Sequence, residues 1–221
     1  MIEVADVVDL MGFLQRLDLA AADLLDERDR YGHGDLVGML PWMTPRYGFR
    51  GSDVPLSVFR GEGMALFLLA RTLKPAMIVE CYTGTGYAAA CLAAGAPNSW
   101  VLSADNYTEG GVGQNGFFVA QTLRDRLGLT NLELVMGSIG DLNGKMNGRG
   151  ADLYLSDGPY SGAPWLDAAA TVIRHDNLDG QVPERVFKVL GGSHMSVMCP
   201  TVERRDALAT EVGRLFPVQI A

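Results

Sequence analysis

The first part of the chain has the hydrophobic pattern of a helix. Between Val4 and about Arg28, apolar residues recur every three or four positions, which places them on one face of an α-helix. The polar face is acidic rather than rich in lysine and arginine, so we expect this helix to pack against the rest of the protein or against a second copy of the chain, not on a membrane. A second helix is predicted from Ser57 to about Thr72, ending before Pro75 because proline cannot continue it.

Between these two helices, glycines and prolines interrupt any period from Tyr31 to Gly63. Irregular segments of this length in compact domains are usually functional or disordered. This one carries several large apolar and aromatic side chains between Trp42 and Phe49, which a disordered linker would mostly lack. We therefore interpret it as a lid over a pocket.

After Pro75, short apolar runs alternate with helical segments. The runs that predict strands are 76–81, 100–105, 132–136, 151–157, 193–199 (taken as the fifth strand) and a last short one at 216–221. Helices are expected over 86–95, about 117–127 and 203–216, and the Gly/Asn-rich segment after residue 136 is expected to be a loop. Strands that alternate with helices pair in parallel through right-handed crossovers. The pattern thus predicts an α/β fold: a Rossmann-like, doubly wound, mostly parallel sheet (64–221) with an N-terminal helical extension (1–63).

Composition narrows the class of protein. The 221 residues include 18 Lys+Arg and 26 Asp+Glu, a net charge of −8, which argues against a nucleic-acid binder that neutralises phosphates. Three cysteines without a C-x-x-C spacing provide neither a disulfide framework nor a zinc finger, so we expect a reducing, cytoplasmic compartment. No apolar run approaches the ~20 residues that span a bilayer.

In a doubly wound sheet, ligands bind beyond the carboxyl ends of the strands, so the residues after each apolar run are the candidates for a site. After the first run, Gly84 and Gly86 lie where strand turns into helix and would let a ligand approach the backbone, although a plain turn explains them as well. Asp105 ends the second run, 21 positions after Gly84. A carboxylate there can accept ribose hydroxyls, and it can equally be an N-cap or turn aspartate.

Polar groups also follow the third and fourth runs. Gly137 and Ser138 stand where the edge of a purine could lie, and Asp157 and Tyr160 add a carboxylate and a phenol after the fourth run. His175 could act as a general base because histidine titrates near neutral pH. A histidine in a surface turn is the structural alternative.

The segment from Gly63 to Pro97 resembles the opening of class I S-adenosylmethionine (SAM)-dependent methyltransferases, in particular the catechol and caffeoyl-CoA O-methyltransferase group. Six residues match that group's first motif, E-x-G-T-G-T-G-Y-S, as they stand: Glu80, Thr83, Gly84, Thr85, Gly86 and Tyr87. The resemblance extends over about 64–197. It implies a cofactor site formed by Glu80, Tyr82, Thr83, Gly84, Gly86, Tyr87, Asp105, Asn106, Gly137, Ser138 and Asp157, with the methionine end of SAM at the first loop and the ribose at Asp105.

The chain departs from the family at several points. Tyr82 replaces the motif's first glycine, so its side chain must point away from the cofactor or partly fill the site. The connection 106–116 is longer and richer in glycine than is usual. The family's catalytic lysine is Tyr160 here.

Metal-dependent members of the family bind Mg²⁺ with an aspartate after the fourth strand and a later Asp-Asn pair. Asp157, Asp176 and Asn177 could supply these oxygen ligands. Only 19 residues separate the two aspartates, however, and a fifth strand at 193–199 would not end at the pair.

The resemblance implies a SAM-dependent methyltransferase for a small-molecule acceptor, with O-methylation expected and with Asp157, Tyr160 and His175 as catalytic candidates. Two other activities fit some of the same residues. Asp157-Gly158-Pro159-Tyr160 is similar to the Asp/Asn-Pro-Pro-Tyr loop of amino-group methyltransferases. Gly84-x-Gly86 followed by Asp105 also satisfies the fingerprint of an NAD(P)-dependent oxidoreductase.

A methyltransferase-like partner module without activity is the last alternative. Tyr82 favours it, and so does the limited length that we expect for a final antiparallel hairpin.

Overall fold

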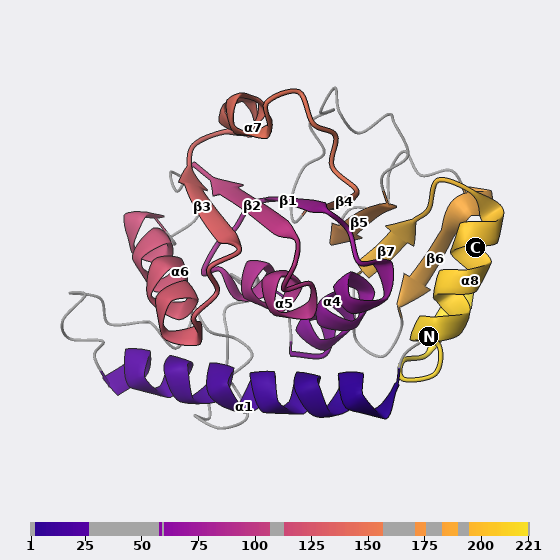
Figure 1. The fold of residues 1–221 in the computed structure, drawn as a ribbon, viewed down its shortest axis with the longest axis horizontal. Helices are drawn as coiled ribbons and strands as arrows, with labels where there is room; N and C mark the ends of the chain where they lie inside the picture. The colour runs from indigo at the N-terminus through magenta and orange to yellow at the C-terminus, as the bar shows by residue number, and fades with distance from the viewer. Residues whose placement is uncertain are drawn as a thin grey trace.

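The computed structural model describes residues 3–26, 58, 60–106, 113–156, 171–175, 183–189 and 195–220. Within them, strands form one sheet of order β3-β2-β1-β4-β5-β7-β6-β8 (Figure 1). The strands are β1 (Met77–Cys81), β2 (Trp100–Asp105), β3 (Leu132–Met136), β4 (Leu153–Ser156), β5 (Thr171–His175), β6 (Val186–Val189), β7 (Met195–Met198) and β8 (Val218–Ile220). Strands β1 to β5 pair in parallel with one another, whereas β7 pairs antiparallel with β5 and β6, and β8 pairs antiparallel with β6.

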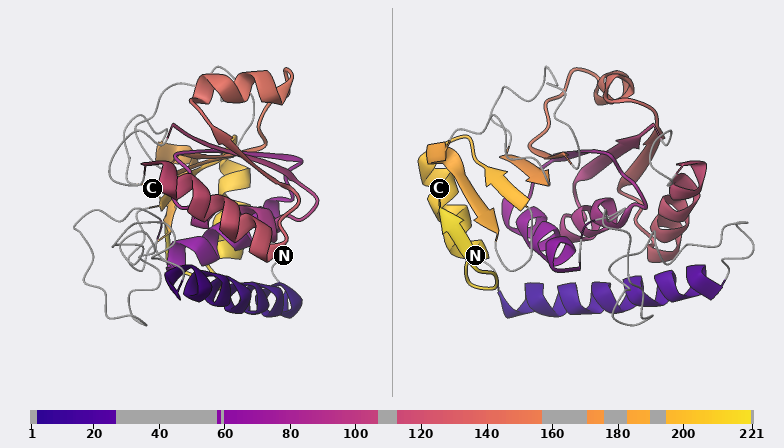
Figure 2. Two further views of the ribbon diagram at one scale, coloured as in Figure 1. Left: turned by 90° about the vertical axis from the view of Figure 1, so that its left-hand side faces the viewer. Right: turned by 180° about the vertical axis from the view of Figure 1, so that it is seen from behind.

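Helices cover both faces of the sheet. They are α1 (Val4–Asp26), α4 (Arg60–Leu73), α5 (Tyr87–Gly95), α6 (Gly113–Leu127), α7 (Ile139–Met146) and α8 (Val202–Val212), with a short 3₁₀ turn, η3, at Pro183–Arg185. Figures 1 and 2 show α7 on one face and α4, α5, α6 and α8 on the other, with α1 running beneath α4 and α6. The predicted Rossmann-like, mostly parallel fold is confirmed. No helix among these described elements has the length and apolarity needed to cross a membrane.

The N-terminal helix packs on the main body, as its hydrophobic pattern predicts. Its apolar face is buried, and the ring of Phe13 stacks on that of Phe67 with 5.7 Å between centroids. Ion pairs border this face: Arg60 binds Asp18 at 2.8 Å, and Arg71 bridges to Asp6 and Asp9. Since α4 begins at Arg60, it runs across the expected boundary at residues 63 and 64.

The prediction of the fifth strand is wrong. The fifth strand is β5 (Thr171–His175), and the run at 193–199 contains β7, which pairs antiparallel with β5 and β6. The hairpin for which we expected little room is therefore present as β6 and β7. Strand β5 lacks an apolar signature because three of its five residues, Thr171, Arg174 and His175, are polar although all three are buried.

Two helical segments also differ from expectation. The Gly/Asn-rich stretch after residue 136 forms α7, and the glycine-rich residues 113–116 form the first turn of α6. A capping box formed by Ser138 and Asp141 begins helix α7. Asp141 Oδ2 accepts hydrogen bonds from the backbone N–H of Ser138 at 2.7 Å and from its hydroxyl at 2.9 Å, which fixes the N-cap and offsets the low helix propensity of two glycines in eight residues.

Helices α4 and α5 approach so closely that Gly95 leaves no room for a side chain. A Cβ at this position would lie 2.3 Å from the carbonyl oxygen of Phe67 and 3.0 Å from its Cα. We expect Gly95→Ala to lower the free energy of unfolding by about 2 kcal/mol, because the helices must separate to admit the methyl group. Urea denaturation measures this loss. The matched control is Gly144→Ala in α7, where no atom lies within 4 Å; it should stabilise the protein by about 0.5–1 kcal/mol.

Candidate functional site

A cavity of about 160 Å³ lies at the carboxyl edge of the sheet. The ends of three neighbouring parallel strands and the residues that follow them line it: Cys81 and Tyr82 after β1, Ala104, Asp105 and Asn106 at β2, and Gly137 and Ser138 after β3. Five of the predicted cofactor residues thus meet in one place, although they are spread over more than fifty positions of the sequence. The topology is responsible, because parallel strands bring their carboxyl ends to the same edge.

The turn between β1 and α5 is held by hydrogen bonds and requires its two glycines. Asp105 Oδ2 accepts from the backbone N–H of Gly84 at 2.9 Å, and Gly86 N–H donates to the carbonyl of Thr83 at 2.8 Å. Gly84 and Gly86 have φ values of 54° and 80°, in the left-handed region that favours glycine. A Cβ on Gly86 would also lie 2.7 Å from that of Ala120. Asp105 therefore both closes the turn and lines the cavity.

Glu80 and Thr83 lie beneath this turn rather than in the cavity wall. The Glu80 carboxylate is fully buried and accepts a hydrogen bond from the hydroxyl of Ser103, whose oxygen lies 2.6 Å from Thr83 Oγ1. These groups tie β1 to β2, which pair in register at Glu80 and Ser103. Their position suits them to hold the turn in place.

Tyr87 packs its ring inside the protein. The side chain is fully buried, and a Cβ at Gly63 of α4 would lie 2.6 Å from the ring. Burial raises the pKa of its phenol well above the ordinary value, so the group stays neutral. Cys81, at the cavity itself, has a thiol pKa raised to about 12 by burial, which leaves no thiolate to act as a nucleophile near neutral pH.

His175 ends strand β5 and is buried, so the alternative that places it in a surface turn is wrong. Its Nε2 lies 3.0 Å from Oε2 of Glu62 on α4, and the two side chains are only 2 % and 1 % exposed. Glu62 belongs to none of the motifs that predicted the site. A glutamate among the apolar residues of α4 was the only available signal, because its partner is 113 positions away.

The remaining candidates, Asp157, Tyr160, Asp176 and Asn177, lie outside the described residues, as does the lid segment 42–49. Strands β4 and β5 are adjacent and parallel, with Ser156 paired to Arg174, so the chain leaves both strands at the same edge. Asp157 directly follows β4 and Asp176 directly follows β5 in the sequence. In the part of the chain that the structure describes, no three His, Cys, Asp or Glu side chains are grouped so as to hold a metal ion.

Several solved methyltransferases share this fold. The O-methyltransferase TomG from Streptomyces achromogenes, involved in tomaymycin synthesis and solved with SAM, has a TM-score of 0.52 and 16 % identity, over 76 % of this chain and 92 % of its own. An O-methyltransferase from Bacillus cereus in complex with S-adenosylhomocysteine (SAH) has a TM-score of 0.50 and 16 % identity, over 82 % and 98 %. A SAH-bound methyltransferase from Podospora anserina has a TM-score of 0.51 and 14 % identity, over 81 % and 96 %.

No protein-family model matches the chain, and no curated protein sequence matches it. At these low identities, the likeness to the solved structures shows a shared fold.

Proposed function

We propose that this protein is a SAM-dependent methyltransferase that acts on a small-molecule acceptor, with a hydroxyl as the acceptor group. The observation that carries the proposal is the cavity at the ends of β1, β2 and β3, where Asp105 and the Gly84 turn lie together. Structures of the same fold have been solved with SAM or SAH bound. The match of Glu80 and residues 83–87 to the first motif of the family supports the same cofactor.

The sheet order favours this function over a nicotinamide-dependent one. Dinucleotide-binding sheets have the order 3-2-1-4-5-6 with parallel strands. Here the strand beyond β5 is β7, and it runs antiparallel. Gly84, Gly86 and Asp105 suit either cofactor, so the antiparallel strand is the feature that separates them.

The described residues fit a nucleoside with an attached amino acid. The carboxylate of Asp105 is a suitable acceptor for ribose hydroxyls, and the left-handed glycines of the turn leave its backbone open to close approach. Bound SAM would supply a methyl group on a positively charged sulfur, which makes it a ready donor. The chain then has to align the acceptor and remove its proton. For these tasks we propose Asp157, Tyr160 and His175; if His175 serves, Glu62 orients its ring.

Magnesium is a further part of the proposal. Asp157, Asp176 and Asn177 are hard oxygen donors of the kind that Mg²⁺ takes. Asp157 directly follows β4, and Asp176 and Asn177 directly follow β5, the strand next to β4. This order supports the three residues as one set of ligands, which the expected fifth strand at 193–199 did not. Chelation by EDTA followed by readdition of Mg²⁺ tests it: turnover should fall and recover.

Titration calorimetry with SAM and with SAH tests the proposed cofactor. We expect the protein to bind both SAM and SAH with a Kd in the micromolar range. Mixing it with NADH should not enhance the fluorescence of NADH. Absence of binding below ~1 mM by a folded sample would contradict the proposal, and NADH binding would favour an oxidoreductase. Cofactor binding without turnover over a broad panel of hydroxyl and amine acceptors would indicate a module without activity, and turnover with amines alone would indicate an N-methyltransferase.

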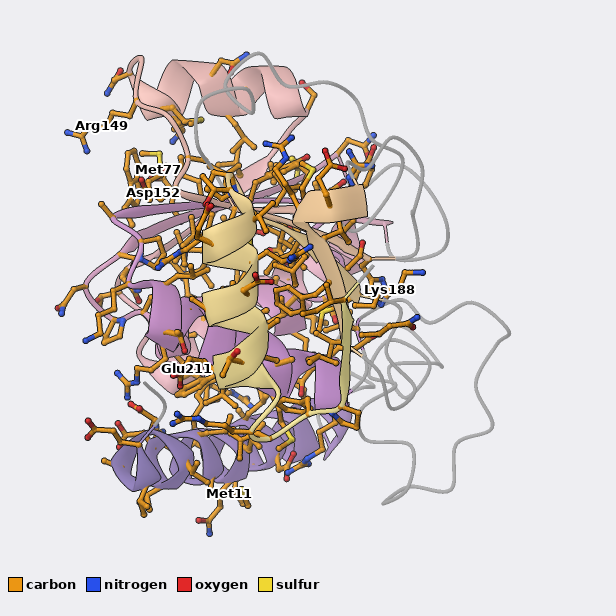
Figure 3. All side chains as sticks on the ribbon, turned by 90° about the vertical axis from the view of Figure 1, so that its right-hand side faces the viewer. Met11, Met77, Arg149, Asp152, Lys188 and Glu211 are labelled. Atoms are coloured by element: carbon orange, nitrogen blue, oxygen red, sulfur yellow. The ribbon has the colours of Figure 1, made fainter. Side chains whose placement is uncertain are left out.

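We also propose that a second copy of the chain covers the outer face of α1. Four exposed apolar residues lie on it: Val4, Val8, Met11 and Leu19. Figure 3 shows Met11 directed away from the rest of the molecule. We place the centre of an antiparallel pair of α1 helices near Gly12, where a Cβ would meet only the end of Arg16. Val4 of one copy would then face Leu19 of the other, and the acidic first turn would approach the partner's Arg16.

This dimer gives a prediction. Met11→Lys should shift the protein from dimer to monomer in sedimentation velocity, because two lysines would face each other at the centre of the pair. The matched control is Met136→Lys, a similarly exposed methionine at the end of β3, which should leave the dimer intact. A wild-type monomer at 100 µM would contradict the proposal.

We also propose a cytoplasmic location, which the three buried, free cysteines support.

A further inference from the structure

Tyr82 adopts a backbone conformation that residues with a side chain rarely take. Its φ is 71°, in the left-handed region where a Cβ is crowded by the backbone. Two of the other non-glycine residues in this region, Lys74 and Asn147, follow the ends of helices, where such a conformation is common. Tyr82 instead follows a buried strand at the candidate site. Strain of this kind persists where the surrounding structure imposes it, and it gathers at functional sites.

The surroundings of Tyr82 fix its backbone. Its own N–H donates to the carbonyl of Ala104 at 2.8 Å, which attaches it to the end of β2. Two residues further on, Gly84 N–H is held by Asp105. The direction of the Cα–Cβ bond is therefore set, and the ring can change its place only by rotation about the side-chain bonds.

Tyr82 lies at the cavity and is not enclosed by the core. Tyr82 is 37 % exposed, and it lines the cavity together with Asp105 and Ser138. The cavity measures about 160 Å³. Sites for drug-sized ligands usually measure roughly 300–1,000 Å³. A nucleoside with an amino-acid tail is of that size, so the cavity as it stands holds only part of the proposed cofactor.

We propose that the side chain of Tyr82 is a gate at this site: its ring occupies part of the space needed by the nucleoside end of the cofactor, and it rotates outward when the cofactor binds. This inference rests on the proposed function and adds a residue that controls access to the site. Outward rotation exposes ring surface to water, so part of the binding free energy is spent on opening. Removing the ring should therefore strengthen binding, whereas removing only the hydroxyl should not.

Three variants separate the ring from the strained backbone. Tyr82→Ala removes the ring and keeps a Cβ in the left-handed conformation, Tyr82→Phe keeps the ring, and Tyr82→Gly removes both the ring and the strain. Titration calorimetry with SAH should give a Kd about tenfold lower for the alanine and glycine variants than for wild type, and no such gain in affinity for the phenylalanine variant. The glycine variant should also melt at a higher temperature than the alanine variant, because it relieves the backbone strain at position 82. If the alanine variant folds poorly, the glycine variant still measures the effect of removing the ring.

The outcomes distinguish the gate from its alternatives. A weaker affinity in both ring-deleted variants would overturn the gate and make the ring a contact surface for the cofactor. An affinity equal to wild type would overturn any role of the ring. Binding by the ring-deleted variants with none by wild type would support a gate that stays closed. Failure of all four folded proteins to bind SAH would instead count against the proposed function itself.

Discussion

Replacing Asp105 with alanine should weaken SAH binding about 100-fold. The carboxylate stands at the end of β2, lines the cavity and is the proposed acceptor for ribose hydroxyls. Hydrogen bonds to a charged group contribute about 1.5–3 kcal/mol each, and 1.4 kcal/mol corresponds to tenfold in affinity, so losing one or two such bonds gives a change of this size. Titration calorimetry measures it directly.

Asp105 also closes the Gly84 turn, so its two tasks have to be separated. Asp105→Asn keeps a carbonyl oxygen for the Gly84 N–H and should stay close to wild type in thermal stability while binding SAH about tenfold more weakly. The matched control is Asp125→Ala, which removes an exposed carboxylate on α6 and should leave the affinity unchanged. If Asp105→Ala bound SAH as wild type does, the cavity would not be the ribose site and the proposed orientation of the cofactor would be wrong.

Sequence patterns predicted the elements whose residues are mostly apolar or follow one clear hydrophobic period. The strands β1, β2 and β4 are short apolar runs because both faces of the sheet are buried there, and α1 has a helical period because only one of its faces is buried. Strand β5 was missed because it carries Arg174 and His175 into the core. Polar groups can be buried there because they interact with residues that are distant in the sequence, and no local sequence pattern encodes such contacts.

In the candidate site, too, some residues could be predicted from the sequence and others could not. Gly84, Asp105 and Ser138 could be placed together from strand order alone, since each follows a predicted parallel strand. The left-handed conformation of Tyr82 could not be read from the residue type, although its mismatch with the family motif marked the position. Glu62 could not be assigned at all, because its role depends on a side chain contributed by β5.

Replacing Glu62 with alanine should lower the free energy of unfolding by about 2–4 kcal/mol. The carboxylate is 1 % exposed and lies 3.0 Å from Nε2 of His175, which is itself 2 % exposed. Without Glu62, the buried imidazole loses the hydrogen bond at Nε2, and removing one partner of a buried hydrogen bond is among the more costly single changes. Urea denaturation of wild type and variant measures the loss.

Two comparisons show whether the pair itself is responsible. The double variant with Glu62→Ala and His175→Ala should lose less than the sum of the two single variants, because each change removes the same hydrogen bond. Glu133→Ala, which breaks the exposed pair with Lys145, should cost less than about 1 kcal/mol, since solvent screens that contact. A loss below 1 kcal/mol for Glu62→Ala would mean that the hydrogen bond between Glu62 and His175 contributes little to the contact between α4 and β5.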